Sequence, residues 1–199
     1  SKLDTSEITD MSQLFKSSKF NGDISNWDVS NVTDMPQMFR NAEEFNQDIS
    51  SWDVSNVTKM SQMFCLARDF NQALNSWDVS NVTTMELMFQ KAIAFNHALD
   101  KWDVSNVTRM YGMFYGTTSF NQNISSWIVS NVTNMYMMFR DAIAFETKFN
   151  NGNSLPYYTS DLKQWLEDNR DKMLDIETLN KESTPEYKIA IIENKISNN

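Results

Sequence analysis

Residues 52–58 read Trp-Asp-Val-Ser-Asn-Val-Thr, and the same heptapeptide recurs every 25 residues along most of the chain. A fixed period of about 20 to 50 residues is typical of solenoids, in which each repeat buries its apolar face against its neighbours. The heptapeptide occurs five times, with Ile for Asp in the last copy, and the copies begin at Trp27, Trp52, Trp77, Trp102 and Trp127. The sequence therefore predicts a stack of similar coils.

Each repeat carries the pattern of one strand followed by one helix. Ile49, Trp52 and Val54 have the spacing of a short strand that points alternate residues into a core, so we expect a strand near Trp52 to Val54. Thr58 stands where a helix N-cap belongs. After it, apolar residues take the i, i+3, i+4 and i+7 positions of a short amphipathic helix: Met60, Met63, Phe64 and Ala67. The expected fold class is an α/β solenoid, a leucine-rich-repeat-like stack of short parallel strands and short helices, closed by a C-terminal helical cap.

Apolar residues outside the heptapeptide recur in the same register. Equivalent residues of stacked coils lie above one another, so each of them predicts a column through the core. Three such columns are Met35, Met60, Met85, Met110 and Met135; Phe39, Phe64, Phe89, Phe114 and Phe139; and Phe20, Phe45, Phe70, Phe95 and Phe120.

The solenoid is expected to cover residues 1–149. Its first repeat is degenerate or truncated, with Leu3 where the later copies have Trp. An uncapped first coil would leave an open strand edge, which natural solenoids avoid. We therefore expect further chain upstream, or a partner that covers this end.

Residues 150–199 are interpreted as a linker followed by a two-helix C-terminal cap. N-cap residues at 159–161 predict a first helix that carries Leu162, Trp165, Leu166 and Met173. Ser183-Thr184-Pro185 predicts a second helix that carries Tyr187, Ile189, Ile192 and Ile196. Ile128 replaces the Asp of the four preceding copies, so we expect its side chain to pack under the cap.

Composition excludes several classes of function. The chain has 199 residues, a formal net charge of −9 and a pI near 4.6. Surfaces that bind nucleic acid need clustered Lys and Arg, so nucleic acid is not an expected partner. No apolar run approaches the roughly 18 residues of a membrane span. The single cysteine, Cys65, cannot form an internal disulfide and leaves the redox compartment open.

The extended pattern Trp-Asp-Val-Ser-Asn-Val-Thr-x-Met-x-x-Met-Phe-x-x-Ala-x-x-Phe-Asn-x-x-Ile-Ser resembles the 25-residue repeat of BspA-type leucine-rich repeat surface proteins. The resemblance covers residues 3 to 149. Proteins of that family are typically surface-exposed or lipid-anchored and are implicated in adhesion and protein binding, and similar repeats occur in large DNA viruses. The resemblance implies a recognition scaffold without enzymatic activity, located outside the cell or on its surface, or alternatively in a virion.

Two polar columns allow both a functional and a structural interpretation. Asp28, Asp53, Asp78 and Asp103 would stack about 5 Å apart, and local capping of the backbone in Asx-turns is favoured over a calcium column. No other metal and no cofactor is expected. Asn31, Asn56, Asn81, Asn106 and Asn131 each open a formal glycosylation sequon. Five glycans at this spacing would collide, so we expect these Asn side chains, like the Trp column, to be structural.

Residues that could support catalysis are scattered. His97 is the only histidine and shares its column with glutamines, which indicates a surface substitution rather than a metal ligand. Cys65 shares its column with arginine, glutamine and tyrosine, which predicts a solvent-facing position on a helix and an incidental thiol. No nucleophile is paired with a base and no glycine-rich phosphate loop is present, so the chain is not expected to be an enzyme.

The positions that vary between repeats are the candidates for partner recognition, because a free surface tolerates more change than a core. Towards the C-terminal half they become apolar, aromatic or cationic, which is the composition of an interface core. The candidate binding residues are Leu87, Arg109, Tyr111, Tyr115, Tyr136, Met137 and Arg140. The terminal helices could instead cover this patch. Two functions stay open: a surface module that binds a protein, on a host or in a neighbouring coat, or a glycan, and a structural or cement component of an assembly such as a virus particle or surface layer.

Overall fold

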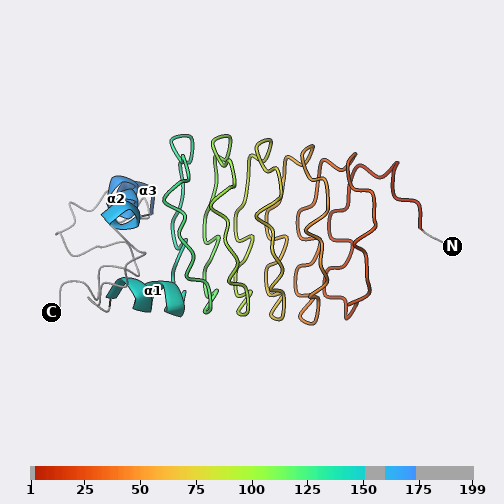
Figure 1. Ribbon diagram of the computed structural model, residues 1–199, viewed down its shortest axis with the longest axis horizontal. Coiled ribbons are helices and arrows are strands. Elements are labelled where there is room, and N and C mark those ends of the chain that lie inside the picture. The colour runs from red at the N-terminus through yellow and green to blue at the C-terminus, as the bar shows by residue number, and fades with distance from the viewer. Residues whose placement is uncertain (1–2, 151–159, 174–199) are drawn as a thin grey trace.

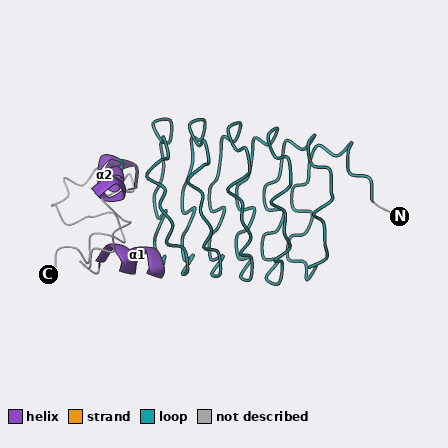
Figure 2. Ribbon diagram, viewed as in Figure 1, coloured by secondary structure: helices purple, strands orange, loops and turns teal. Residues whose placement is uncertain are grey.

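The computed structural model describes residues 3–150 and 160–173. The chain winds into successive coils that stack side by side along the longest axis, with the helices at the C-terminal end (Figure 1). The coils themselves are loops and turns (Figure 2). Within the described residues, helix is confined to α1 (Ile143–Asn150), α2 (Ser160–Asp168) and α3 (Arg170–Met173).

Isolated parallel β-bridges, one residue wide, join neighbouring coils. They form one continuous column through Asp10, Asp34, Lys59, Thr84, Arg109 and Asn134. The strand predicted near Trp52 to Val54 is therefore wrong in position. That stretch belongs to two turns, because the N–H of Trp52 donates to the Ile49 carbonyl oxygen and the N–H of Val57 donates to that of Val54.

The segment that follows each bridge is not the helix that its apolar spacing predicts. The N–H of Gln62 donates to the carbonyl oxygen of Glu86 in the next coil over 2.8 Å, whereas the N–H of Met63 donates to the Met60 carbonyl oxygen three residues back. Every second N–H is thus used between coils. Since a helix needs each N–H for a carbonyl four residues back, the chain forms a run of turns instead.

Left-handed residues make this run of turns possible. Gln62 has a φ of 58° and Leu66 a φ of 62°, each as the third residue of a turn. A type II turn requires positive φ at this position and favours glycine there. The chain supplies glycine only in one coil, at Gly112 and Gly116. We call the six bridge-and-turn segments the ladder segments and their outer surface the ladder face; they comprise residues 10–17, 34–41, 59–66, 84–91, 109–116 and 134–141.

The apolar spacing correctly predicts which residues are buried. Met60, Met63, Phe64 and Ala67 are each 0% exposed. Phenylalanine rings stack from coil to coil, with the ring centroids of Phe64 and Phe89 separated by 5.6 Å. The predicted Met and Phe core columns are confirmed, except that Phe20 in the first coil is only partly buried.

α2 and α3 pack against the last coil. Trp165 and Leu166 in α2 and Met173 in α3 are buried. The ammonium group of Lys172 donates to the Val129 carbonyl oxygen over 2.6 Å, and burial lowers the pKa of this lysine. The helix predicted to carry Trp165, Leu166 and Met173 is thus divided in two, since α2 ends at Asp168. The second predicted helix, with Tyr187 and Ile189, lies outside the described residues.

Ile128 does not pack under the described part of this cap. Its side chain is 66% exposed, so that expectation is wrong. The Asp residues of the same column are exposed as well, which shows that the position faces outward whichever residue occupies it. No helix in the described part of the chain is long and apolar enough to cross a membrane.

Candidate functional site

The repeated Trp and Asn side chains donate hydrogen bonds between coils. The indole N–H of Trp77 donates to the Ile49 carbonyl oxygen over 3.0 Å, and Trp52, Trp102 and Trp127 make the equivalent bond. The side-chain amide of Asn81 donates to the Ser55 carbonyl oxygen over 2.7 Å, and Asn31, Asn56, Asn106 and Asn131 do the same. The nitrogen that a glycan would modify is therefore engaged in each of these residues.

The Asp column caps the backbone locally. Asp53 accepts hydrogen bonds from the hydroxyl of Ser55 over 2.6 Å and from its N–H over 3.1 Å, and these bonds hold the pKa of Asp53 below its ordinary value of 3.8. Asp28, Asp78 and Asp103 each accept the N–H of the serine two residues on. Within residues 3–150 and 160–173, no cluster of three or more His, Cys, Asp or Glu is placed to hold a metal ion.

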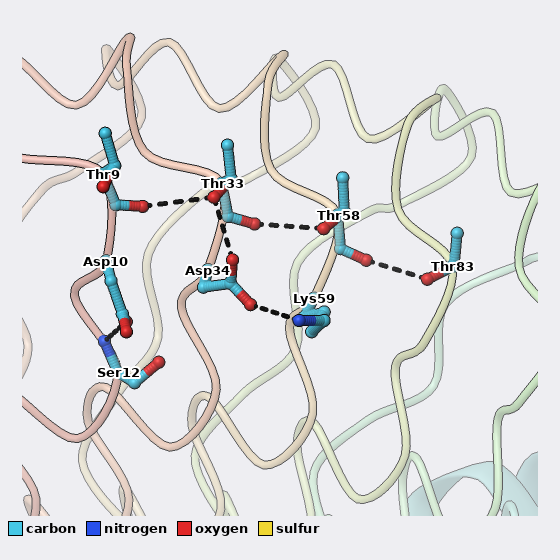
Figure 3. A network of polar contacts seen from close by, with 8 residues as sticks. All are labelled: Thr9, Asp10, Ser12, Thr33, Asp34, Thr58, Lys59 and Thr83. Carbon is cyan, nitrogen blue, oxygen red and sulfur yellow. Dashed lines mark hydrogen bonds and ion pairs between the residues drawn. The ribbon is translucent and has the colours of Figure 1, made fainter.

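The N-terminal half of the ladder face is a polar network (Figure 3). The N–H and hydroxyl of Thr58 both donate to the Thr33 carbonyl oxygen, over 2.8 and 3.3 Å. Beside this threonine column, the Lys59 ammonium lies 2.7 Å from the Asp34 carboxylate. Hydrogen bonds from Lys59 and from the Thr33 hydroxyl lower the pKa of Asp34. These polar side chains pair with one another, whereas Gln37 Oε1 and Arg40 Nε on the same half of the face are buried without a hydrogen-bond partner among the described residues.

The C-terminal half of the ladder face is aromatic and brings four of the predicted binding residues together. The rings of Tyr111 and Tyr136 have centroids 6.1 Å apart. The Tyr111 hydroxyl lies 3.7 Å from the Met137 sulfur, and Arg140 Nη1 lies 3.9 Å from the same atom. The tyrosines and Met137 are half-buried and Arg140 is exposed, so each offers surface to a partner. We call Leu87, Arg109, Tyr111, Tyr115, Tyr136, Met137 and Arg140 the aromatic patch.

Of the remaining patch residues, Arg109 and Tyr115 lie on ladder segment 109–116 and Leu87 lies on the neighbouring segment 84–91. Leu87 rests over Gly112, where an added Cβ would come within 2.6 Å of Leu87 Cδ2. Arg109 is the exposed bridge residue between Thr84 and Asn134. Tyr115 is half-buried and lies under the Lys91 ammonium, 5.7 Å from its ring centroid. Sequence reasoning missed Lys91 and Gly112. Two of the chain's four glycines fall four residues apart in one coil, and that spacing is the signal that could have found Gly112.

Several residues of the ladder face hold backbone conformations that their side chains disfavour. Leu87 has a φ of 55°, Lys91 of 54° and Met137 of 58°. A non-glycine residue in the left-handed region costs on the order of 1 kcal/mol, and such strain clusters at functional sites. Glycine is accepted at both positions in the fifth coil, so the backbone does not require side chains there. Because Gln62 and Leu66 have nearly the same φ in another coil, this strain belongs to the fold and does not by itself mark a binding site.

Cys65 and His97 lie in different environments. Cys65 is buried, which corrects the expectation of a solvent-facing thiol. Its Sγ donates to Gln90 Oε1 over 3.2 Å, and burial raises the pKa of the thiol. His97 Nε2 lies 3.0 Å from the Asn71 carbonyl oxygen, the contact that Gln72 and Gln122 make in their own coils. The described residues thus place no base beside this thiol.

Comparison with known proteins identifies a family for most of the chain. The family described as "Mycoplasma protein of unknown function, DUF285" matches residues 1–97 and again residues 72–178. No curated protein and no solved structure matches. The two matches overlap within the repeats and together span the coils and the described cap, so the chain belongs to the DUF285 family.

Proposed function

We propose that the chain is a non-catalytic protein-binding module and that the aromatic patch is its binding surface. The supporting observation is the group of half-buried side chains on one face, with the Tyr111 and Tyr136 ring centroids 6.1 Å apart and the Met137 sulfur 3.7 Å from the Tyr111 hydroxyl. A core side chain contributes to stability through burial, but Tyr111, Tyr136 and Met137 are only half-buried. Aromatic and arginine side chains of this kind dominate the binding energy of protein interfaces.

The proposal also includes the fold class of the chain and the location of the protein. The heptapeptide repeat and the membership of the DUF285 family support a relationship to BspA-type repeat proteins and a leucine-rich-repeat-like solenoid. We infer a place outside the cell or on its surface, with a protein as the partner and a glycan as a less favoured one. Half-buried apolar rings suit a protein better, since a protein partner can bury them.

Site-specific photo-crosslinking in the native source tests the proposal. A photoreactive benzoylphenylalanine replaces Tyr111 in one variant and Ile128 in a control, which is 66% exposed on another part of the coils. We expect one dominant crosslinked protein from position 111 and none from position 128. The crosslink should disappear when Tyr136→Ala and Arg140→Ala are added. Equal crosslinking from both positions would exclude the aromatic patch as the binding surface.

A structural role is the second candidate, and it would use the exposed apolar side chains of the first coil. Leu3 and Leu14 are 60% and 50% exposed, and Phe15 and Trp27 are only partly buried. Equivalent rings in inner coils, such as Phe39, are fully buried. An upstream coil would bury these side chains, and so would a coat or surface-layer neighbour that covers this end. Crosslinks from position 14 to an abundant coat protein, without crosslinks from position 111, would favour this role.

A further inference from the structure

Charge is segregated between the ladder face and the rest of the coils. Residues 3–145 contain nine Lys and Arg and sixteen Asp and Glu. The ladder segments hold six of these cations but only four of the anions, which leaves a formal charge of +2 on them and −9 on the remainder. The ladder cations are Lys16, Arg40, Lys59, Lys91, Arg109 and Arg140, and the ladder anions are Asp10, Asp34, Glu86 and Asp141. An acidic protein therefore presents one relatively cationic face.

Arg109 and Arg140 of the aromatic patch, and Lys91 beside it, form no ion pair with a carboxylate among the described residues. Ion pairs join Lys59 with Asp34 and Arg68 with Glu43, and neither pair involves these three cations. Arg109, Arg140 and Lys91 are exposed and have no such pair among the described residues. Lys91 lies over the Tyr115 ring and Arg140 beside the Met137 sulfur. Their charge is thus available to a partner beside apolar surface.

The rest of the surface stays negative and repels acidic molecules. Asp23, Asp48, Asp53 and Asp103 each accept hydrogen bonds from a serine two residues on, and these bonds lower the pKa of every one of these carboxyls. They remain ionised at neutral pH. Like-charge repulsion on the flanks and attraction on the ladder face direct an acidic partner to this face, since complementary potentials steer association.

We propose that the aromatic patch, together with Lys91 beside it, docks an acidic peptide segment of a partner protein, with its carboxylates at Arg109, Arg140 and Lys91 and its apolar side chains on Leu87 and Tyr111. The proposal rests on the proposed protein-binding function and names the chemistry of its partner. A nucleic acid fits less well, because it carries one charge per about 1.7 Å, whereas the ladder segments carry a formal charge of only +2 beside −9 on the other coil residues. A peptide with spaced carboxylates matches spaced cations and avoids that repulsion.

Fluorescence anisotropy with defined probes tests this inference on the full chain. The probes are labelled peptides of alternating Glu and Leu, of alternating Lys and Leu, and an oligothymidylate. We expect the Glu-Leu peptide to bind most tightly and its affinity to fall as salt rises past about 0.15 M, where the Debye length is about 8 Å. The double variant Arg109→Glu with Arg140→Glu should weaken this peptide at least about tenfold.

A charge-matched control separates local docking from net charge. Lys19 and Lys101 are exposed and lie outside the ladder segments, so Lys19→Glu with Lys101→Glu changes the net charge equally. This control should reduce binding less than about twofold, since its charges are remote and screened. Circular dichroism verifies that both double variants are folded.

Several outcomes overturn the inference. Among these are no binding of the Glu-Leu peptide, equal loss in both double variants, or preference for the oligothymidylate or the Lys-Leu peptide. The proposed function is tested apart from this by the crosslink from position 111. If that crosslink persists in Arg109→Glu with Arg140→Glu, the patch binds a protein but the acidic chemistry of the partner is wrong.

Discussion

The indole N–H of Trp165 in α2 donates to the backbone carbonyl oxygen of Trp127 over 2.8 Å. Within the stack, each buried Trp makes a comparable bond to a carbonyl of the preceding coil, as Trp127 does to Leu99 over 2.8 Å. In the described cap, a residue of a helix thus makes the same contact that joins one coil to the next. α3 replaces a second contact of a neighbouring coil, because the Lys172 carbonyl oxygen accepts the N–H of Met135 over 2.7 Å.

Trp165→Phe should destabilise the C-terminal coil, because it leaves the Trp127 carbonyl oxygen buried without a donor. An unsatisfied buried acceptor costs about 1–3 kcal/mol. In the Trp165→Phe variant, amide hydrogen exchange should become faster around Trp127 than around Trp52. The reason is that each coil in a stack contacts only its neighbours. Asp171→Asn, at an exposed position of α3, is the control and should leave exchange unchanged.

Gly112→Ala should destabilise the protein by about 1–3 kcal/mol, since it combines left-handed strain with overpacking. The φ of Gly112 is 54°, and the new Cβ would lie 2.6 Å from Leu87 Cδ2. Adding Leu87→Ala should recover part of that loss, which a double-mutant cycle in denaturant measures. At the equivalent position, Gln62→Gly should be nearly neutral, because relief of strain at a φ of 58° offsets the added chain entropy. Strictly additive effects of the two alanines would contradict the contact.

Asn81→Asp should destabilise at neutral pH, because a carboxylate replaces the amide donor and faces the Ser55 carbonyl oxygen. We expect the free energy of unfolding to fall by about 1 kcal/mol. This is the low end of the range for a lost hydrogen bond, because Asn81 is exposed. Protonation of the new carboxyl restores a donor, so the loss should shrink in acid. Asn26→Asp is the control, an exposed position outside the Asn column. Chemical denaturation at neutral and acidic pH compares the two.

Stability should fall as the pH drops below the ordinary Asp pKa of 3.8, because Asp53 and Asp103 have lowered pKa values in the folded protein. A carboxyl with a lowered folded pKa contributes stability above its unfolded pKa and loses it as pH falls through the folded pKa. The largest cause at Asp53 is the Ser55 hydroxyl. Ser55→Ala should therefore raise the pKa of Asp53, as NMR titration measures. An unchanged value would contradict this cause, and Ser119→Ala serves as the control.

Cys65 should react with a thiol reagent only when the stack opens. The side chain is 2% exposed, and burial raises its thiol pKa, so little thiolate is present in the folded state. Labelling rates should rise with denaturant in parallel with unfolding measured by circular dichroism. Rapid labelling of the native protein would show that the thiol is accessible after all.

The repeat period and the identity of the core residues follow from the sequence without a structure. Apolar residues at i, i+3, i+4 and i+7 predict the burial of Met60, Met63, Phe64 and Ala67 correctly. Variable positions of the repeats predict the residues of the aromatic patch, and the structure brings Tyr111, Tyr136, Met137 and Arg140 together, whereas their role in binding stays a prediction. Burial depends on such local spacing, and spacing is visible in a single repeat.

Backbone conformation depends instead on partners in the next coil. The N–H of Gln62 can stay in a helix or donate to Glu86, and that choice rests on a carbonyl 24 residues away. Once such bonds form, left-handed residues replace the helix, Lys59 rather than Trp52 forms the bridge, and Cys65 turns inward. The same stacking collects cations from separate repeats onto one face. These outcomes follow from hydrogen bonds between coils, and an isolated repeat cannot form such bonds.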